Sequence, residues 1–135
     1  MKFVLSCYGT RGDIEPSVAV GRELLRRGHD VRIGVPPDLV GFAEAAGLAT
    51  VAHGLDTQVW LDMYRNFWMS SFRKFWKIPD LIRSWRELMA FSDQCWAEMN
   101  TTLTSLADRA DLLVTGMGFE QSAANVAEYY DIPLA

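Results

Sequence analysis

Short apolar runs alternate with amphipathic stretches at both ends of this sequence. The apolar runs are four or five residues long, which suits strands, and the stretches between them repeat apolar side chains at helical spacing. The pattern predicts strands at residues 2–6, 31–35, 50–53, 111–115 and 132–135, and helices at residues 16–27, 39–46 and 119–130. This order is typical of an α/β fold, here a Rossmann-like parallel sheet with helices on both faces.

Turn and capping residues set the expected limits of these helices. Pro16 suits the first position of a helix, and Gly28 suits the position after its end. Glu15 would then be the N-cap of the first helix, and Asp38 would cap the second.

The middle of the chain has a different pattern, with large aromatic side chains between residues 60 and 76 near a helical period. After Pro79 a second apolar pattern continues to residue 106, so we expect an aromatic-rich pair of helices inserted between two strands. Most aromatic stripes at helical spacing are buried core. An aromatic face beside Arg65, Arg73, Lys74 and Lys77 also suits a bulky apolar ligand or a membrane interface.

Composition and charge narrow the possible functions. The chain has 135 residues, enough for one domain, and half of them are hydrophobic, which favours a folded core. The net charge of −4 argues against a general nucleic-acid binder. The charge is uneven, because residues 58–86 carry six Lys/Arg and two Asp/Glu, whereas residues 87–135 carry one and eight.

Cysteine usage and the lack of targeting signals indicate a cytoplasmic protein. Cys7 and Cys95 have no metal-site spacing, so we expect two reduced core thiols. The first apolar run is too short for a secretory signal, and no run of about 18 apolar residues could span a membrane. The sequence stops on a predicted strand, so we expect residues 1–135 to be an incomplete domain of a larger protein.

The segment from Gly9 to Asp13 is the main candidate for chemistry. It follows the first strand, at the carboxyl edge of the sheet where ligands bind in open parallel sheets, and a helix N-terminus there attracts anions. The spacing Gly9-x-x-Gly12 does not fit the glycine pattern of a dinucleotide site, and the second strand ends in prolines rather than an acid. His53 follows the third strand at the same edge and is a less favoured candidate base.

Several motifs together resemble one family. They are Tyr-Gly-Thr-Arg-Gly-Asp-Ile-Glu-Pro at residues 8–16, Arg-Gly-His-Asp-Val at 27–31, Val-Pro-Pro at 35–37, Ala-Ala-Gly-Leu at 45–48, Asp-Leu-Leu-Val-Thr-Gly at 111–116 and Ile-Pro-Leu at 132–134. This set resembles the N-terminal, acceptor-binding domain of GT-B glycosyltransferases of the glycosyltransferase 28 or UDP-glycosyltransferase-like type. The resemblance is greatest to actinobacterial glycolipid, glycopeptide and sterol glycosyltransferases.

The resemblance implies an inverting transfer of a hexose from a UDP- or dTDP-linked sugar. The acceptor would be a hydroxyl of a bulky, partly apolar molecule such as a glycolipid, lipopeptide or sterol. Asp13 would be the general base, and Thr10, Arg11 and Gly12 would lie near the donor phosphates or the transferred sugar. No metal or further cofactor is implied. The C-terminal donor-binding domain would be absent from this chain, which would be inactive alone.

The resemblance also implies two walls for the acceptor. Met69, Phe72 and Trp76 would form one wall, and Gly118, Phe119 and Gln121 the other. Peripheral contact with the inner face of the membrane, and homo-oligomers through truncated surfaces, are further expectations.

Each assignment has an alternative that involves no catalysis. Asp13 could be only a turn or cap residue, and Arg11 only a solvated loop residue. The domain as a whole could bind ligands or dock on membranes without catalysing a reaction.

Overall fold

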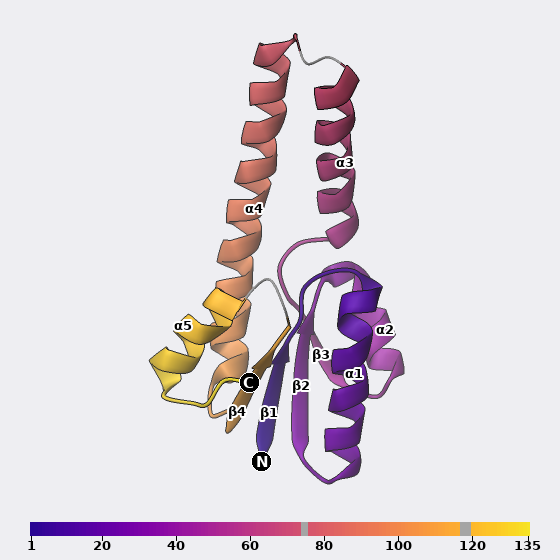
Figure 1. The fold of residues 1–135 in the computed structure, drawn as a ribbon. Helices are drawn as coiled ribbons and strands as arrows, with labels where there is room; N and C mark the ends of the chain where they lie inside the picture. The colour runs from indigo at the N-terminus through magenta and orange to yellow at the C-terminus, as the bar shows by residue number, and fades with distance from the viewer. Residues whose placement is uncertain (74–75, 117–119) are drawn as a thin grey trace.

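A four-stranded parallel sheet forms the centre of the protein. The computed structural model describes residues 1–73, 76–116 and 120–135. The strands are β1 (Lys2–Ser6), β2 (Asp30–Val35), β3 (Ala49–Ala52) and β4 (Leu112–Thr115), in the spatial order β3-β2-β1-β4 (Figure 1). Phe3 pairs with Val31 on one side and with Leu112 on the other, so the predicted strands of the first and last parts share one sheet.

Helices cover both faces of this sheet, as the sequence predicts. The helical segments are α1 (Arg11–Arg26), the short 3-10 helix η1 (Pro37–Leu39), α2 (Val40–Ala45), α3 (Thr57–Arg73), α4 (Ile78–Ala107) and α5 (Glu120–Tyr130). Neighbouring residues of a strand point to opposite faces, so Leu5 packs with Ile14 of α1 whereas Val4 packs with Leu103 of α4. The core therefore has two layers separated by the sheet.

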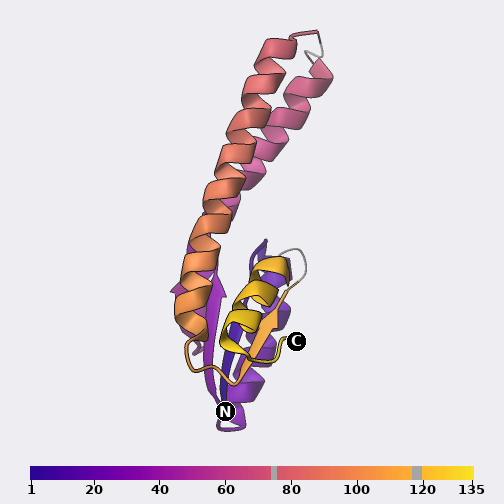
Figure 2. The same ribbon diagram turned by 90° about the vertical axis from the view of Figure 1, so that its left-hand side faces the viewer.

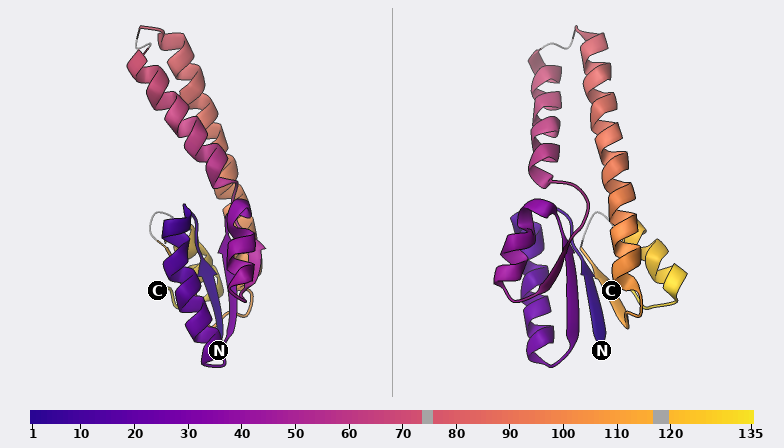
Figure 3. Two further views of the ribbon diagram at one scale, coloured as in Figure 1. Left: turned by 90° about the vertical axis from the view of Figure 1, so that its right-hand side faces the viewer. Right: turned by 180° about the vertical axis from the view of Figure 1, so that it is seen from behind.

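α3 and α4 form a long helical hairpin that projects from the carboxyl edge of the sheet (Figures 1, 2 and 3). This confirms the predicted pair of inserted helices. Phe67 and Trp85 contact each other between the two helices, with ring centroids 5.5 Å apart. Among the described residues of the hairpin, none between Thr57 and Leu88 is buried, so these residues make no contribution to the core.

The start of α1 differs from the prediction. The helix begins at Arg11 with Thr10 as its N-cap, so Pro16 lies inside the helix and Glu15 is not a cap. The sequence rule that places proline at the first helical position misled here, because a capping interaction between Thr10 and Asp13 starts the helix more than one turn earlier.

Two smaller predictions also differ from the structure. Asp38 makes no capping hydrogen bond to α2. Its Oδ1 instead accepts a hydrogen bond from the backbone N–H of Thr57, 3.3 Å away, and so ties η1 to the start of α3. The strand predicted for residues 132–135 is reduced to a single parallel bridge between Leu134 and Leu113.

Candidate functional site

The loop that follows β1 is held in place at the base of the hairpin. The carbonyl of Gly9 accepts a hydrogen bond from the buried Thr57 hydroxyl, 3.2 Å away, and the Tyr8 hydroxyl donates to the carbonyl of Leu55 at 2.9 Å. The backbone of Gly9 has a φ of 142°, a conformation that residues with a side chain rarely adopt. The loop conformation therefore depends on glycine at this position.

Asp13 lies in the first turn of α1, and Thr10 fixes its side chain. The Asp13 Oδ2 atom accepts two hydrogen bonds from Thr10, one from the backbone N–H at 2.7 Å and one from the hydroxyl at 2.8 Å. The side chain of Asp13 is exposed, and no described residue donates a hydrogen bond to its Oδ1. One carboxylate oxygen is thus used for positioning, and the other faces solvent or ligand.

A largely apolar cavity of about 360 Å³ opens on one side of Asp13. This volume is in the range of small-molecule sites. The loop after β1, the first turn of α3 and the middle of α4 all contribute to its lining. The lining residues are Tyr8, Gly9, Thr10, Asp13, Thr57, Trp60, Leu61, Ser92, Cys95 and Trp96.

A second, smaller cavity of about 260 Å³ lies on another side of Asp13, between α1 and the end of β4. Its lining includes Gly12, Pro16 and Gly116, and it shares Tyr8 and Asp13 with the larger cavity. Asp13 therefore borders two separate spaces, one walled by the hairpin and one at the N-terminus of a helix.

Two ionisable side chains near this edge are neutral, the partly buried Tyr8 and the fully buried His53. The pKa of the Tyr8 phenol is raised, mainly by burial and to a smaller extent by a hydrogen bond with Cys95. This hydroxyl therefore remains a hydrogen-bond donor at neutral pH. Burial lowers the pKa of His53 to about 4. His53 Nε2 hydrogen-bonds with the Ser6 hydroxyl at 3.0 Å, and its ring is fully buried, which does not fit a catalytic base.

The predicted donor-side residues lie at the start of α1, but their side chains differ in position. Thr10 lines the larger cavity and Gly12 the smaller one. The Arg11 guanidinium lies over the Phe42 ring of α2, 4.6 Å from its centroid, and lines neither cavity. A role of Arg11 in phosphate binding stays a prediction.

The structure places the three predicted acceptor residues of the hairpin away from Asp13. Met69, Phe72 and Trp76 are exposed on the distal part of the hairpin, and Phe72 is about 18 Å along α3 from Trp60. Gln121 is exposed in the first turn of α5, and Gly118 and Phe119 lie outside the described residues. Acceptor binding by these six residues stays a prediction.

The cavity residues that sequence analysis missed come from the parts of the hairpin nearest the sheet. Trp60 and Leu61 are in the first two turns of α3, and Ser92, Cys95 and Trp96 are about halfway along α4. The usable signal was position: an inserted helix starts close to the strand edge that it leaves, so its first aromatic residue is the one nearest the site.

Neither a metal cluster nor a membrane span is found in the described ranges. There is no group of three or more His, Cys, Asp or Glu side chains that could hold a metal ion among these residues. Within the same ranges, no helix combines the length and hydropathy that crossing a bilayer requires. Cys7 and Cys95 are free, buried thiols.

Curated relatives of this chain include mycobacterial glycosyltransferases. An uncharacterized glycosyltransferase of Mycobacterium leprae (strain TN) is 53% identical over 135 residues, covering 98% of this chain and 30% of the relative. Another, of Mycobacterium tuberculosis (strain ATCC 25618 / H37Rv), is 51% identical over 136 residues, covering 100% of this chain and 31% of the relative. The chain thus spans about 30% of the length of these relatives.

Solved glycosyltransferases have the same fold. The calicheamicin glycosyltransferase CalG4 superposes with a TM-score of 0.66 at 17% identity, covering 98% of this chain and 29% of that one. The glycosyltransferase VinC, solved in complex with dTDP, gives 0.63 at 18% identity, covering 99% of this chain and 33% of that one.

The family model of the glycosyltransferase family 28 N-terminal domain matches residues 3–124, which is most of the chain. The sheet, the two layers of helices and the site at the carboxyl edge agree with this match. The chain therefore belongs to the glycosyltransferase family 28 N-terminal domain family, and its fold is that of the N-terminal half of a GT-B glycosyltransferase.

Proposed function

We propose that this domain binds the acceptor of an inverting, metal-independent hexosyl transfer, with Asp13 as the general base. The observation that carries the proposal is the position of Asp13, oriented by two hydrogen bonds from Thr10 at the border between two cavities. An acceptor in the larger cavity and a sugar donor reaching the smaller one would meet at this carboxylate.

The reaction needs one base in this arrangement. The acceptor hydroxyl gives its proton to Asp13 Oδ1 while its oxygen attacks the anomeric carbon from the side opposite the nucleotide. The bond from the anomeric carbon to the diphosphate oxygen breaks, and the nucleoside diphosphate leaves with the electron pair. Because a diphosphate is a good leaving group, no second carboxylate is required to protonate it, unlike in glycoside hydrolases.

The larger cavity supports an acceptor that is bulky and partly apolar. Trp60, Leu61 and Trp96 give its wall a hydrophobic character, while Thr57 and Ser92 add hydroxyl groups that can orient a polar end. This combination suits the hydroxyl-bearing part of a glycolipid, lipopeptide or sterol-like compound.

The donor is a UDP- or dTDP-linked sugar in this proposal, bound mainly by a C-terminal domain of the whole protein. The chain's share of its relatives' length leaves room for such a domain. The present chain alone is then inactive, and the use of a nucleotide sugar places the reaction in the cytoplasm.

The test uses the full-length protein with radiolabelled UDP-glucose or dTDP-glucose and a total membrane-lipid extract of the source organism. Asp13→Asn is expected to lower transfer about 100- to 10,000-fold while donor affinity, measured by titration calorimetry, stays unchanged. Glu15→Gln is the matched control, because Glu15 is another exposed acid on α1.

Two results would contradict the proposal. Transfer by Asp13→Asn within about tenfold of the wild-type rate excludes the base role. Lipid binding by the wild type without transfer from either donor favours the alternative, a non-catalytic ligand-binding domain of the same fold.

A further inference from the structure

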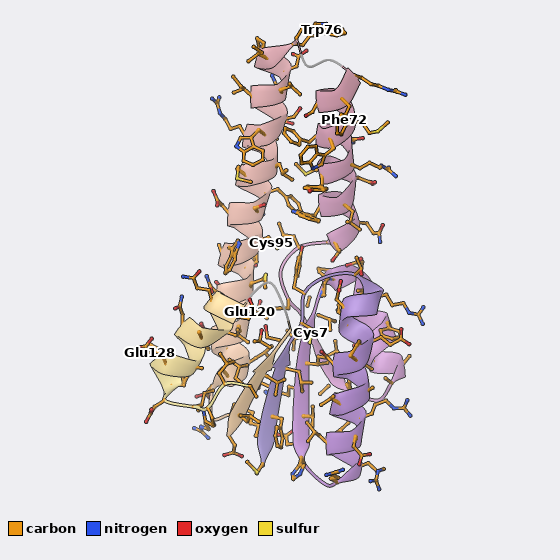
Figure 4. All side chains as sticks on the ribbon, viewed as in Figure 1. Cys7, Phe72, Trp76, Cys95, Glu120 and Glu128 are labelled. Atoms are coloured by element: carbon orange, nitrogen blue, oxygen red, sulfur yellow. The ribbon has the colours of Figure 1, made fainter. Side chains whose placement is uncertain are left out.

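The distal part of the hairpin exposes large apolar side chains. We call this part the hairpin tip, meaning the described residues among 65–86, all on α3, α4 and their connection. Phe72 is 77% exposed, Trp76 66% and Ile78 61%. Figure 4 shows Phe72 and Trp76 at the end of the hairpin that lies furthest from the sheet. Folding of the domain leaves these groups in contact with water.

The same tip is strongly basic. Residues 65–86 contain six Lys/Arg and one Asp, whereas the other 113 residues contain seven Lys/Arg and sixteen Asp/Glu. Arg65 pairs with Asp62 at 2.9 Å, but four further cations of the tip make no ion pair with any described residue. These four are Arg73, Lys77, Arg83 and Arg86.

We propose that the hairpin tip docks on an anionic lipid surface. Phe72, Trp76 and Ile78 enter the boundary between headgroups and acyl chains, and the neighbouring cations lie against lipid phosphates. A lipid interface has an apolar layer of acyl chains and an anionic layer of headgroups. The aromatic and the basic side chains of the hairpin tip match these two layers.

Charge favours a bilayer over a second copy of the chain. A symmetric dimer through the tip would place two basic surfaces against each other, and this repulsion opposes assembly. A protein partner must present acids at matching positions, whereas an anionic bilayer presents phosphates over its whole surface. The acidic remainder of the chain is repelled by that surface, which orients the domain with its tip toward the lipid.

The experiment is co-flotation of the protein with vesicles of phosphatidylcholine alone or mixed with phosphatidylglycerol. The wild type is expected to float with the mixed vesicles, and less so as salt concentration rises. The double variants Phe72→Ser/Trp76→Ser and Arg73→Gln/Lys77→Gln are each expected to lower binding to mixed vesicles at least about tenfold.

Matched controls change equally exposed groups elsewhere. Tyr129→Ser replaces a 77% exposed aromatic side chain on α5, and Arg22→Gln/Arg109→Gln removes two cations outside the tip. Both are expected to bind within about twofold of the wild type, since neither touches the tip. Thermal unfolding of all variants checks that they fold.

Three results would overturn the proposal: no flotation of the wild type, equal flotation with both vesicle types, or unchanged binding by the tip variants. A wild-type dimer in sedimentation analysis that Phe72→Ser/Trp76→Ser dissociates would assign the tip to self-association instead. Asp13→Asn is expected to float like the wild type, so a failure of flotation and a failure of glycosyl transfer are separate findings.

Discussion

At the scale of single residues, the position of the Asp13 carboxylate depends on the absence of a side chain at Gly9. A Cβ atom on Gly9 would lie 2.6 Å from Asp13 Oδ2, which is closer than real Cβ contacts. The space beside Gly9 is therefore occupied by the proposed base, and Thr10 holds that base there. Glycine serves this site through its positive φ and through its missing side chain.

Gly9→Ala is expected to displace the Asp13 carboxylate and lower glycosyl transfer by the full-length protein about 100-fold, since errors of about 1 Å in catalytic geometry have effects of this size. Steady-state transfer assays measure the change. Gly41→Ala is the control, because a Cβ at Gly41 meets nothing within 4 Å. Equal rates for the two variants would show that the Gly9 contact does not position Asp13.

His53 makes the stability of the fold depend on pH. Burial lowers its pKa to about 4 in the folded protein, below the ordinary histidine value of 6.5, so the unfolded chain binds the proton more readily. This contribution to stability is complete above about pH 6.5 and is lost as pH falls toward 4, amounting to about 3 kcal/mol. Urea unfolding at pH 7, 6, 5 and 4 measures it.

His53→Asn is expected to lose this part of the pH dependence, whereas His29→Asn keeps it. The comparison between variants separates the histidine from the carboxylates that also titrate below pH 5. Parallel curves for the wild type and His53→Asn would contradict the assignment.

At the scale of elements, α4 combines two different environments in one continuous helix. Its C-terminal half packs into the core through Met99, Leu103 and Leu106, whereas its N-terminal half carries exposed side chains from Ile78 onward. The first buried residue of the helix is Leu88, and the next is Cys95, which also lines the larger cavity. The change from surface to core therefore takes place over these two turns. The cavity wall is thus built on the last turns before the core begins.

This division predicts a large difference between two chemically identical substitutions on α4. Met99→Ala is expected to lower the free energy of unfolding by about 2–5 kcal/mol, because Met99 is 1% exposed and leaves a cavity. Met89→Ala, at a position that is 37% exposed, is expected to change it by about 0.5 kcal/mol or less. Urea unfolding followed by circular dichroism compares them, and similar losses would contradict the division.

Element order was predictable from sequence, but element ends were less so. The strands β1, β2 and β4 were found because each is a short apolar run with buried positions, and β3 was found from its short run between turn residues although none of its residues is buried. The start of α1 was missed because Pro16 is a strong local signal, while the reciprocal interaction of Thr10 and Asp13 appears only once the backbone has turned. The last strand was overestimated because an apolar run carries no information about its partner.

At the scale of the whole molecule, the candidate site joins segments far apart in the chain. Asp13 and its loop could be singled out because they follow β1 directly at the ligand-binding edge of the sheet. The cavity wall that includes Trp60 and Trp96 could not, because it depends on how the base of a hairpin of two helices packs beside that edge. Aromatic content pointed to the insert, but local composition does not distinguish side chains near the sheet, such as Trp60, from those that project away from it, such as Phe72.

None of the described residues of the distal hairpin is buried, and this also bears on how such proteins diverge. Insertions or deletions of whole helical turns there, matched in α3 and α4, leave the sheet, Asp13 and the cavity wall untouched. Two turns removed from each helix would shorten the projection by about 11 Å. Natural selection can therefore vary the length and composition of this segment at little risk to folding, while the residues that hold the carboxylate evolve under separate constraints.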